Sequence, residues 1–185
     1  MGNAGAGFNF LISTIFDLYA FVVMLRFLMQ LTRADYYNPV SQFVVNATDP
    51  LLKPLRRFIP GFGGYDIAAI VLCFIVLLVK FILLQAIGGT TVTGIGGSVV
   101  AAIVGAYREV GLIGVLLDVF FFSILAMVIL SWVSPGGNPI SSLLRSITSP
   151  ILTPIQKVVP PMGGFDLSPL VALIAIQFIR IVFRV

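Results

Sequence analysis

Apolar residues gather along this chain into four long runs, separated by shorter segments that carry the prolines and most of the charges. The runs cover about residues 8–32, 67–87, 111–133 and 167–185. They are too long for the core helices of a small soluble domain, and about 20 residues suffice to cross hydrocarbon about 30 Å thick. The pattern therefore predicts four transmembrane helices.

A shorter apolar piece lies between the second and third runs. It covers residues 99–107 and follows the glycine- and threonine-rich stretch 88–98. Nine residues are too few to span a bilayer, so we expect an interfacial or re-entrant turn there. The glycines of 88–97 lack the Gly-Lys-Ser/Thr ending of a phosphate loop, which favours a flexible outer turn.

Composition supports the membrane assignment. Hydrophobic residues make up 59% of the 185 residues and charged residues 10%, and the mean hydropathy is +1.12. A soluble domain carries roughly 25% charged residues. Lipid must therefore replace water over much of the surface, and the first run, with no Lys or Arg before it, is expected to remain as an anchor.

The same composition removes most familiar catalytic chemistry. The chain has no histidine and a single cysteine, Cys73. A Cys/His zinc site, a haem attachment motif, a disulfide framework and a histidine-based triad are excluded. We expect no enzyme activity, no metal and no cofactor, and we interpret Cys73 as a small packing residue.

Basic residues predict the orientation, because cytoplasmic loops are enriched in Lys and Arg. The connections between runs one and two and between runs three and four hold most of them, whereas the other side has only Arg108 and Arg184. Both termini should then lie outside, which in a bacterium means the periplasmic side of the inner membrane. The basic residues of the two connections are Arg33, Lys53, Arg56, Arg57, Arg145 and Lys157.

An internal repeat is the strongest signal in the sequence. Asp17 matches Asp118 at an offset of 101, and the later positions match at 100, which implies one inserted residue. The repeated positions are Asn38, Pro39, Thr48, Pro50, Pro54, Pro60, Gly63, Gly64 and Asp66, matched by Asn138, Pro139, Thr148, Pro150, Pro154, Pro160, Gly163, Gly164 and Asp166.

The repeat divides the chain into three parts. Residues 1–87 form the first repeat, 88–110 an extracytoplasmic connection and 111–185 the second repeat. Because each repeat contains two spans, both enter the membrane from the same side and are parallel rather than inverted. The expected fold is an all-α polytopic membrane protein of two such two-helix repeats, with short cytoplasmic amphipathic helices.

The cytoplasmic segments have a readable local chemistry. We interpret Asn38-Pro39 as a helix stop, and Thr48 before Asp49-Pro50 as the N-cap of a short surface helix that Pro54 limits. Asp66 is placed to cap the next span. Apolar and basic residues interleave after Pro50, which predicts contact with anionic headgroups. The headgroup-contact residues are Lys53, Arg56, Arg57 and, in the second copy, Lys157.

These motifs resemble a known family. Asn-Pro, Thr-(Asp/Ser)-Pro-(Leu/Ile)-Leu-x-Pro and Pro-x-x-Gly-Gly-(Tyr/Phe)-Asp look like the YggT family, called YlmG in cyanobacteria and plastids. The resemblance covers nearly the whole chain in two copies. The second copy keeps the family's Asp-Leu-Ser-Pro at 166–169, whereas the first departs from it with Asp-Ile-Ala-Ala at 66–69.

The resemblance implies a function without catalysis. Plastid relatives are tied to haem assembly on the cytochrome b6f complex and to nucleoid distribution. Bacterial relatives are associated with cell division and with osmotic or potassium tolerance. No enzymatic activity comes with the family.

Five ionisable residues fall at membrane depth, where charges are expensive. Arg26 lies toward the cytoplasmic end of the first span. Counting 1.5 Å per residue places Asp17 level with Lys80, and Asp118 level with Arg180. We predict that an acid and a base meet within each repeat or across the pseudo-twofold axis. Such pairs either neutralise each other and fix helix register, or form part of an ion or proton path. A further alternative is that Lys80 and Arg180 extend toward the outer headgroups.

Together these features favour a non-enzymatic membrane scaffold or assembly factor. It would engage lipid headgroups and a protein partner, which is either a second copy of the chain or another membrane protein. The alternative is a channel or transport-related protein in ion, especially potassium, or osmotic homeostasis. The basic residues are explained by topology, so we expect no direct contact with nucleic acid.

Overall fold

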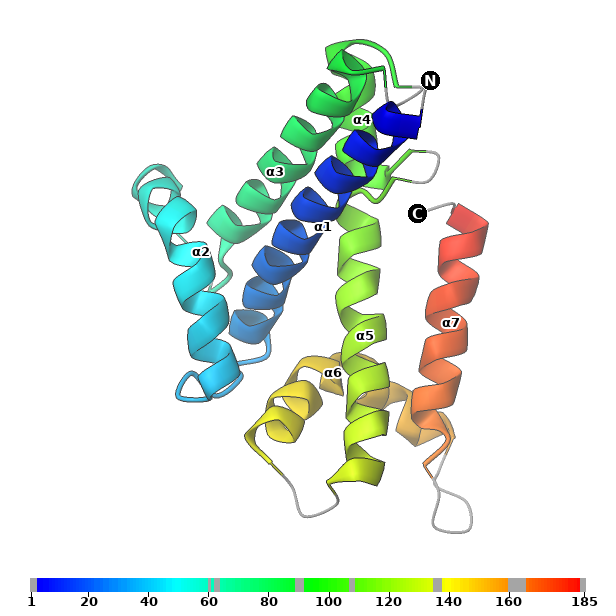
Figure 1. The fold of residues 1–185 in the computed structure, drawn as a ribbon. Helices are drawn as coiled ribbons and strands as arrows, with labels where there is room; N and C mark the ends of the chain where they lie inside the picture. Colours follow the sequence, from blue (N-terminus) through cyan, green and yellow to red (C-terminus); the bar gives the residue numbers. More distant parts are fainter. Residues whose placement is uncertain are drawn as a thin grey trace.

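The computed structural model describes residues 3–59, 61, 64–88, 92–106, 109–134, 138–159 and 166–183. These residues form helices joined by turns (Figure 1), and the expected all-α class is confirmed for them. The helices are α1 (Asn3–Leu31), α2 (Pro39–Phe58), α3 (Ile67–Ala86), α4 (Gly94–Val104), α5 (Leu112–Val133), α6 (Pro139–Val158) and α7 (Ser168–Phe183).

Three of these helices are long and apolar enough to cross a membrane, namely Gly5–Leu31 of α1, Ile67–Ala86 and Leu112–Val133. The fourth expected span is shorter in the structure, because α7 has 16 described residues and is therefore about 24 Å long. Large apolar side chains stay exposed on these helices, including Phe10, Phe178 and Ile181. A helix that is apolar all round suits lipid rather than water.

The core lies where α1 packs against α3 and α5. Ala20 on α1 and Ala69 and Cys73 on α3 are fully buried, and the thiol of Cys73 lies 3.7 Å from the carbonyl oxygen of Ala20. Small side chains let helix backbones approach closely, which is typical of membrane helix interfaces. Figure 1 shows α1 beside α3, α5 beside α7, and the start of α1 at the same end as the end of α7.

The prediction for the segments after the first and third runs was wrong about where their helices begin. Asn-Pro does not stop a helix: Asn38 and Asn138 are the N-caps of α2 and α6, and the prolines that follow occupy the first turn. The side chain of Asn38 accepts a hydrogen bond from the backbone of Val40, and Asn138 accepts one from Ser141. Asparagine before proline is a favourable helix start, because the asparagine satisfies an orphan N–H and the proline has none.

α2 and α6 also continue through two internal prolines each. Pro54 was expected to limit the length of the first surface helix, but α2 continues past it to Phe58. Pro50 has no N–H to donate, and proline in a helix normally leaves carbonyls of the preceding turn unpaired. The carbonyl that loses its donor to Pro50 is that of Asn46, four residues back, and the threonine hydroxyls bond instead to carbonyls two residues earlier in the same turn. The hydroxyl of Thr48 donates to the carbonyl of Val44 at 2.7 Å, and that of Thr148 donates to Leu144 at 2.9 Å.

The connection between the two repeats contains a helix rather than only a turn. α4 begins inside the glycine-rich stretch at Gly94 and ends at Val104, and its C-cap is Gly105, whose φ of +94° favours glycine. Ser98 on α4 bonds to the side chain of Gln85 on α3. A side chain at Gly111 would collide with the backbone of Gly105, so the two glycines allow the chain to turn from α4 into α5. The last residue of the expected turn, Tyr107, lies outside the described residues.

Candidate functional site

Two groups of charged side chains lie inside the helix bundle. The first, which we call the Lys80 cluster, consists of Asp17 on α1, Lys80 on α3 and Glu109 before α5. Lys80 is fully buried, and its Nζ lies 2.7 Å from Oδ1 of Asp17, 2.8 Å from the carbonyl oxygen of Val110 and 3.4 Å from Oε2 of Glu109. An ammonium group has three N–H donors. All three therefore have an acceptor within reach, and the cluster joins α1, α3 and the segment before α5.

The second repeat places an equivalent pair between α5 and α7. Nη1 of Arg180 lies 2.6 Å from Oδ1 of Asp118, and both side chains are partly exposed. The structure thus brings together both acid–base pairs singled out in the sequence, each within its own repeat. Sequence reasoning missed Glu109, whose signal was an acid directly preceding the third apolar run.

Arg26 is the centre of another group that sequence reasoning missed, which we call the Arg26 cluster: Arg26 on α1 with Thr48, Asp49 and Lys53 on α2. Nη1 of Arg26 donates to Oδ1 of Asp49 and Oγ1 of Thr48, both at 2.6 Å, and to the carbonyl of Val45 at 2.9 Å. Lys53 reaches the other oxygen of Asp49 at 2.9 Å. The cluster fastens α2 to α1.

The electrostatics of Asp49 follow from this geometry. Burial opposes ionisation of the carboxyl group, but the hydrogen bonds and positive charges of Lys53 and Arg26 outweigh it. They hold the pKa of Asp49 below its ordinary value of 3.8. Asp49 is therefore a carboxylate over the whole neutral range.

The second repeat replaces this cluster with neutral side chains. At the offset of the upstream register, Met127 occupies the position of Arg26, and Ser149 and Thr153 occupy those of Asp49 and Lys53. The hydroxyl of Thr148 lies 3.6 Å from the sulfur of Met127. The arginine and its acid are thus absent together, as expected if each charge needs the other.

The ion pair between Arg56 and Asp66 also loses its basic partner in the second repeat. Asp66 caps α3 by accepting from the backbone of Ala69 at 3.3 Å, as the sequence predicted, and is paired with Arg56. In the second repeat Gln156 donates to Asp166 at 2.9 Å instead. Burial opposes ionisation of Asp166, but hydrogen bonds from Ser168 and Gln156 hold its pKa below 3.8.

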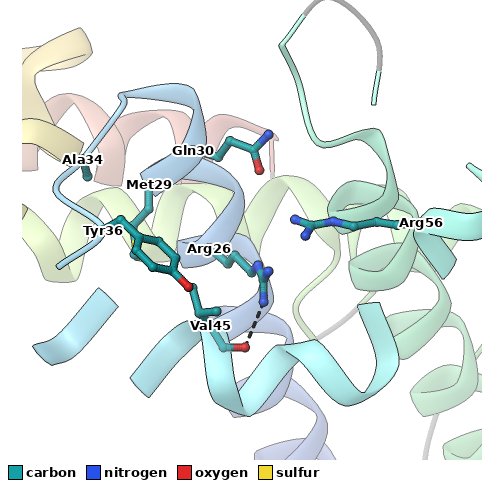
Figure 2. A pocket seen from close by; sticks show the side chains of 7 residues that line it. All are labelled: Arg26, Met29, Gln30, Ala34, Tyr36, Val45 and Arg56. Atoms are coloured by element: carbon teal, nitrogen blue, oxygen red, sulfur yellow. Dashed lines mark hydrogen bonds between the residues drawn. The ribbon is translucent and has the colours of Figure 1, made fainter. Parts of the chain in front are cut away.

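A pocket of about 240 Å³ opens beside the Arg26 cluster, and Figure 2 shows the side chains around it. It lies between the second half of α1, the turn that follows, and α2. The guanidinium groups of Arg26 and Arg56 enter it from these two helices. Its lining residues are Arg26, Met29, Gln30, Ala34, Tyr36, Val45 and Arg56.

The side chains expected to touch headgroups lie on outer surfaces of α2 and α6. Lys53, Arg57 and Lys157 are exposed, although Lys53 also pairs with Asp49. Arg56 is exposed as well, and it is also paired with Asp66 and lines the pocket.

The repeat-motif residues serve mainly as helix starts, helix breaks and caps. Asn38, Thr48, Asp66 and Thr148 are buried, whereas the internal prolines are exposed. Gly64 has a φ of +86° in the turn before α3. The positions Pro60, Gly63, Pro160, Gly163 and Gly164 lie outside the described residues. The internal prolines are Pro50, Pro54, Pro150 and Pro154, and the remaining described motif residues are Pro39, Asn138, Pro139 and Asp166.

Among the residues that the structure describes, the clustered acids do not form a metal site. In the described ranges, no group of three or more His, Cys, Asp and Glu side chains could hold a metal ion. The acids of the Lys80 cluster are held by an ammonium group instead.

The long apolar helices and their buried, paired charges define the class of this chain as an α-helical membrane protein. Comparison with known families makes the assignment specific. The CCB3/YggT family model matches residues 6–87 and 108–185, so the chain belongs to the CCB3/YggT family, with two matched segments.

Relatives are similar over most of their length. An uncharacterised protein of Pseudomonas aeruginosa is 45% identical over 171 residues, covering 92% of this chain and 84% of that protein. One of Vibrio alginolyticus is 41% identical, covering 92% of this chain and 89% of that protein. The protein YggT of Escherichia coli K12 is 37% identical, covering 93% and 86%. No solved structure matches the chain.

Proposed function

We propose that this chain is a non-enzymatic membrane scaffold or assembly factor of the bacterial inner membrane. In this proposal α1, α3, α5 and α7 all span the bilayer, as two repeats inserted the same way round. α2 and α6 then lie at the cytoplasmic headgroup layer, and both termini lie in the periplasm. The partner is a second copy of the chain or another membrane protein.

The observation that carries the proposal is the surface of α2. Exposed Phe43, Leu51 and Phe58 lie on the same helix as exposed Lys53 and Arg57, while Val44 and Leu52 are buried against the bundle. Exposed apolar groups beside lysine and arginine are expected where a helix lies between hydrocarbon and water. Such a helix can meet both lipid and a membrane-bound partner.

The arrangement of the intramembrane charges favours a structural role for them. Lys80 has an acceptor for each of its three N–H groups, and two of these acceptors come from carboxylates. A saturated, buried ion pair holds helices in register. The alternative function, transport of an ion such as potassium, would require these charges to exchange partners with the ion.

Photo-crosslinking in native membranes tests the scaffold. A crosslinking amino acid is placed at Phe58 on α2 or at Ser142 on α6, both exposed. The matched control carries it at Ile181, which is exposed on α7. We expect a discrete protein adduct from the first two positions and lipid adducts alone from Ile181.

The same adduct should weaken when the shape or charge of α2 is changed. Pro50→Ala, Pro54→Ala and Arg57→Gln alter exposed positions of that helix. Absence of any protein adduct at Phe58 and Ser142, together with potassium conductance of the purified chain in liposomes, would replace the scaffold by the transport alternative.

A further inference from the structure

We propose that the pocket between α1 and α2 binds a phosphate group, clamped between the guanidinium groups of Arg26 and Arg56. The inference rests on the proposed function, because that function places α2 beside the headgroup layer. The ligand is either a phospholipid headgroup or a soluble phosphate, and both present the same oxyanion to the two arginines.

The pocket lining combines the polar groups of Arg26, Gln30 and Arg56 with largely apolar walls from Met29, Ala34, Tyr36 and Val45. Two guanidinium groups and the amide of Gln30 face it, and none of its seven lining residues is acidic. In Figure 2 the side chain of Arg56 extends toward Arg26, and the side chain of Gln30 is seen above these two arginines. A volume of about 240 Å³ is below the 300–1,000 Å³ or so of pockets for drug-sized ligands. It suits a small anion or a headgroup.

Arg26 keeps donors for a ligand. In the described part of the chain, its hydrogen bonds to Val45, Thr48 and Asp49 all leave from Nη1. A guanidinium carries five N–H donors in a planar fork, so those of Nε and Nη2 are left for the pocket. Arg26 itself is buried, and the bonds from Nη1 fix its orientation in advance.

The local charge balance is positive. Asp49 and Asp66 are paired with Arg26 and Arg56, but neither acid lines the pocket. Lys53 and Arg57, which are exposed on α2, add two further positive charges to this helix. Arginine binds phosphate through two parallel N–H···O bonds. Two arginines on different helices can therefore hold several oxygens of one phosphate group.

The second repeat shows that this packing does not require the arginines. Met127 and Gln156 stand at the positions of Arg26 and Arg56, and α6 still packs on α5 and α7. Gln156 still bonds to the acid that precedes the following helix. This packing therefore does not account for the charges of Arg26 and Arg56, and anion binding is a use for them that the pocket geometry supplies.

The repeat also provides the variants for a test. Arg26→Met with Asp49→Ser installs the neutral set of the second repeat, and Arg56→Gln installs its glutamine. Arg145→Gln on α6 is the matched control, because it removes the same charge from an exposed position that does not line the pocket. The purified full chain in detergent is titrated with phosphatidylglycerol, with phosphatidylcholine, and separately with inorganic phosphate. Bound lipid is counted by native mass spectrometry and phosphate binding is followed by calorimetry.

We expect the unmodified chain to retain one phosphatidylglycerol, or one inorganic phosphate, at least about tenfold more strongly than either pocket variant, since charge-assisted hydrogen bonds are lost. Arg145→Gln should bind like the unmodified chain. Retention of lipid without phosphate binding identifies a headgroup site, and binding of inorganic phosphate at equal strength identifies a soluble ligand.

Equal weakening by Arg145→Gln and Arg56→Gln would show a diffuse surface attraction and overturn the pocket. Unchanged binding in both pocket variants would do the same. Helical content by circular dichroism identifies a variant that fails to fold, and Arg56→Gln then carries the test. The scaffold proposal fails independently, through loss of the crosslinked partner while phosphate binding is kept.

Discussion

At the scale of single residues, the two repeats act as a mutational comparison within one chain. The acid–base pair between the two long helices is kept in both copies, as Asp17–Lys80 and Asp118–Arg180. The pairs of α2 are not kept, because Met127 and Gln156 replace Arg26 and Arg56. Register between spans thus needs a charge pair in each repeat, whereas attachment of α2 or α6 does not.

Lys80→Met should destabilise the protein strongly. The substitution leaves Asp17 and Glu109 without the buried cation that holds both, and breaking a buried pair costs about 3–5 kcal/mol. Thermal unfolding in detergent, followed by circular dichroism, measures the loss. Arg180→Met is the matched control and should cost less, because its pair is partly exposed. Equal losses in the two variants would contradict a special role for the Lys80 cluster.

Asp49 should make stability depend on pH in the acid range. Its pKa is lowered by Lys53 and Arg26 against the effect of burial, so its contribution is complete above the ordinary value of 3.8 and is lost as pH falls through the lowered pKa. Arg26→Met with Asp49→Ser should remove this part of the acid-induced loss. Thermal unfolding between pH 6 and about pH 3 measures it. An unchanged pH profile in the variant would contradict the assignment.

The pairing of Asp17 with Lys80 could be derived from the sequence because both lie on straight apolar helices whose depth follows from counting residues. The partner of Arg26 could not. Thr48 and Asp49 were interpreted as the start of a helix, whereas they lie in its middle, on the turn that faces α1. Because the predicted helix started at the wrong residue, the prediction could not assign the helix face on which Asp49 lies.

At the scale of elements, α2 and α6 are defined by competing signals. Proline inside a helix argues for a break, while asparagine before proline argues for a start. The structure shows that the start signal at Asn38 prevails and that α2 continues through Pro50, with the hydroxyl of Thr48 bonded to the carbonyl of Val44. In this family unit a threonine two residues before an internal proline is therefore compatible with a continuous helix.

Asn38→Ala should reduce stability more than Asn138→Ala. Both residues cap a helix, and loss of a cap costs about 1 kcal/mol. Asn38 is buried and also donates from Nδ2 to the carbonyl of Pro139, which joins the starts of α2 and α6. Chemical unfolding of the two variants in detergent measures the difference. A larger effect of Asn138→Ala would show that this link between the repeats contributes little.

At the scale of the whole molecule, the sequence repeat and the contacts describe the same unit. α1 packs with α3 and α5 with α7, and each pair is joined through one amphipathic helix. The number of spans could be proposed from the apolar runs, and α7 accounts for 16 residues of the fourth run within the described part of the chain. Hydropathy identifies the apolar runs, whereas the contacts that pair α1 with α3 and α5 with α7 required the structure.

Cysteine labelling tests whether the two repeats enter the membrane from the same side. Cys73 is buried and is first replaced by alanine. Single cysteines are then introduced as Lys53→Cys on α2, Lys157→Cys on α6 and Ile95→Cys on α4, all at exposed positions.

If each repeat contains two spans, α2 and α6 share one face and α4 lies on the other. A membrane-impermeant maleimide should label Ile95→Cys in intact spheroplasts, and the other two only after permeabilisation. Labelling of Lys53→Cys and Lys157→Cys on opposite faces would require an odd number of crossings between them, and the parallel repeat would then be wrong even though the helix contacts stand.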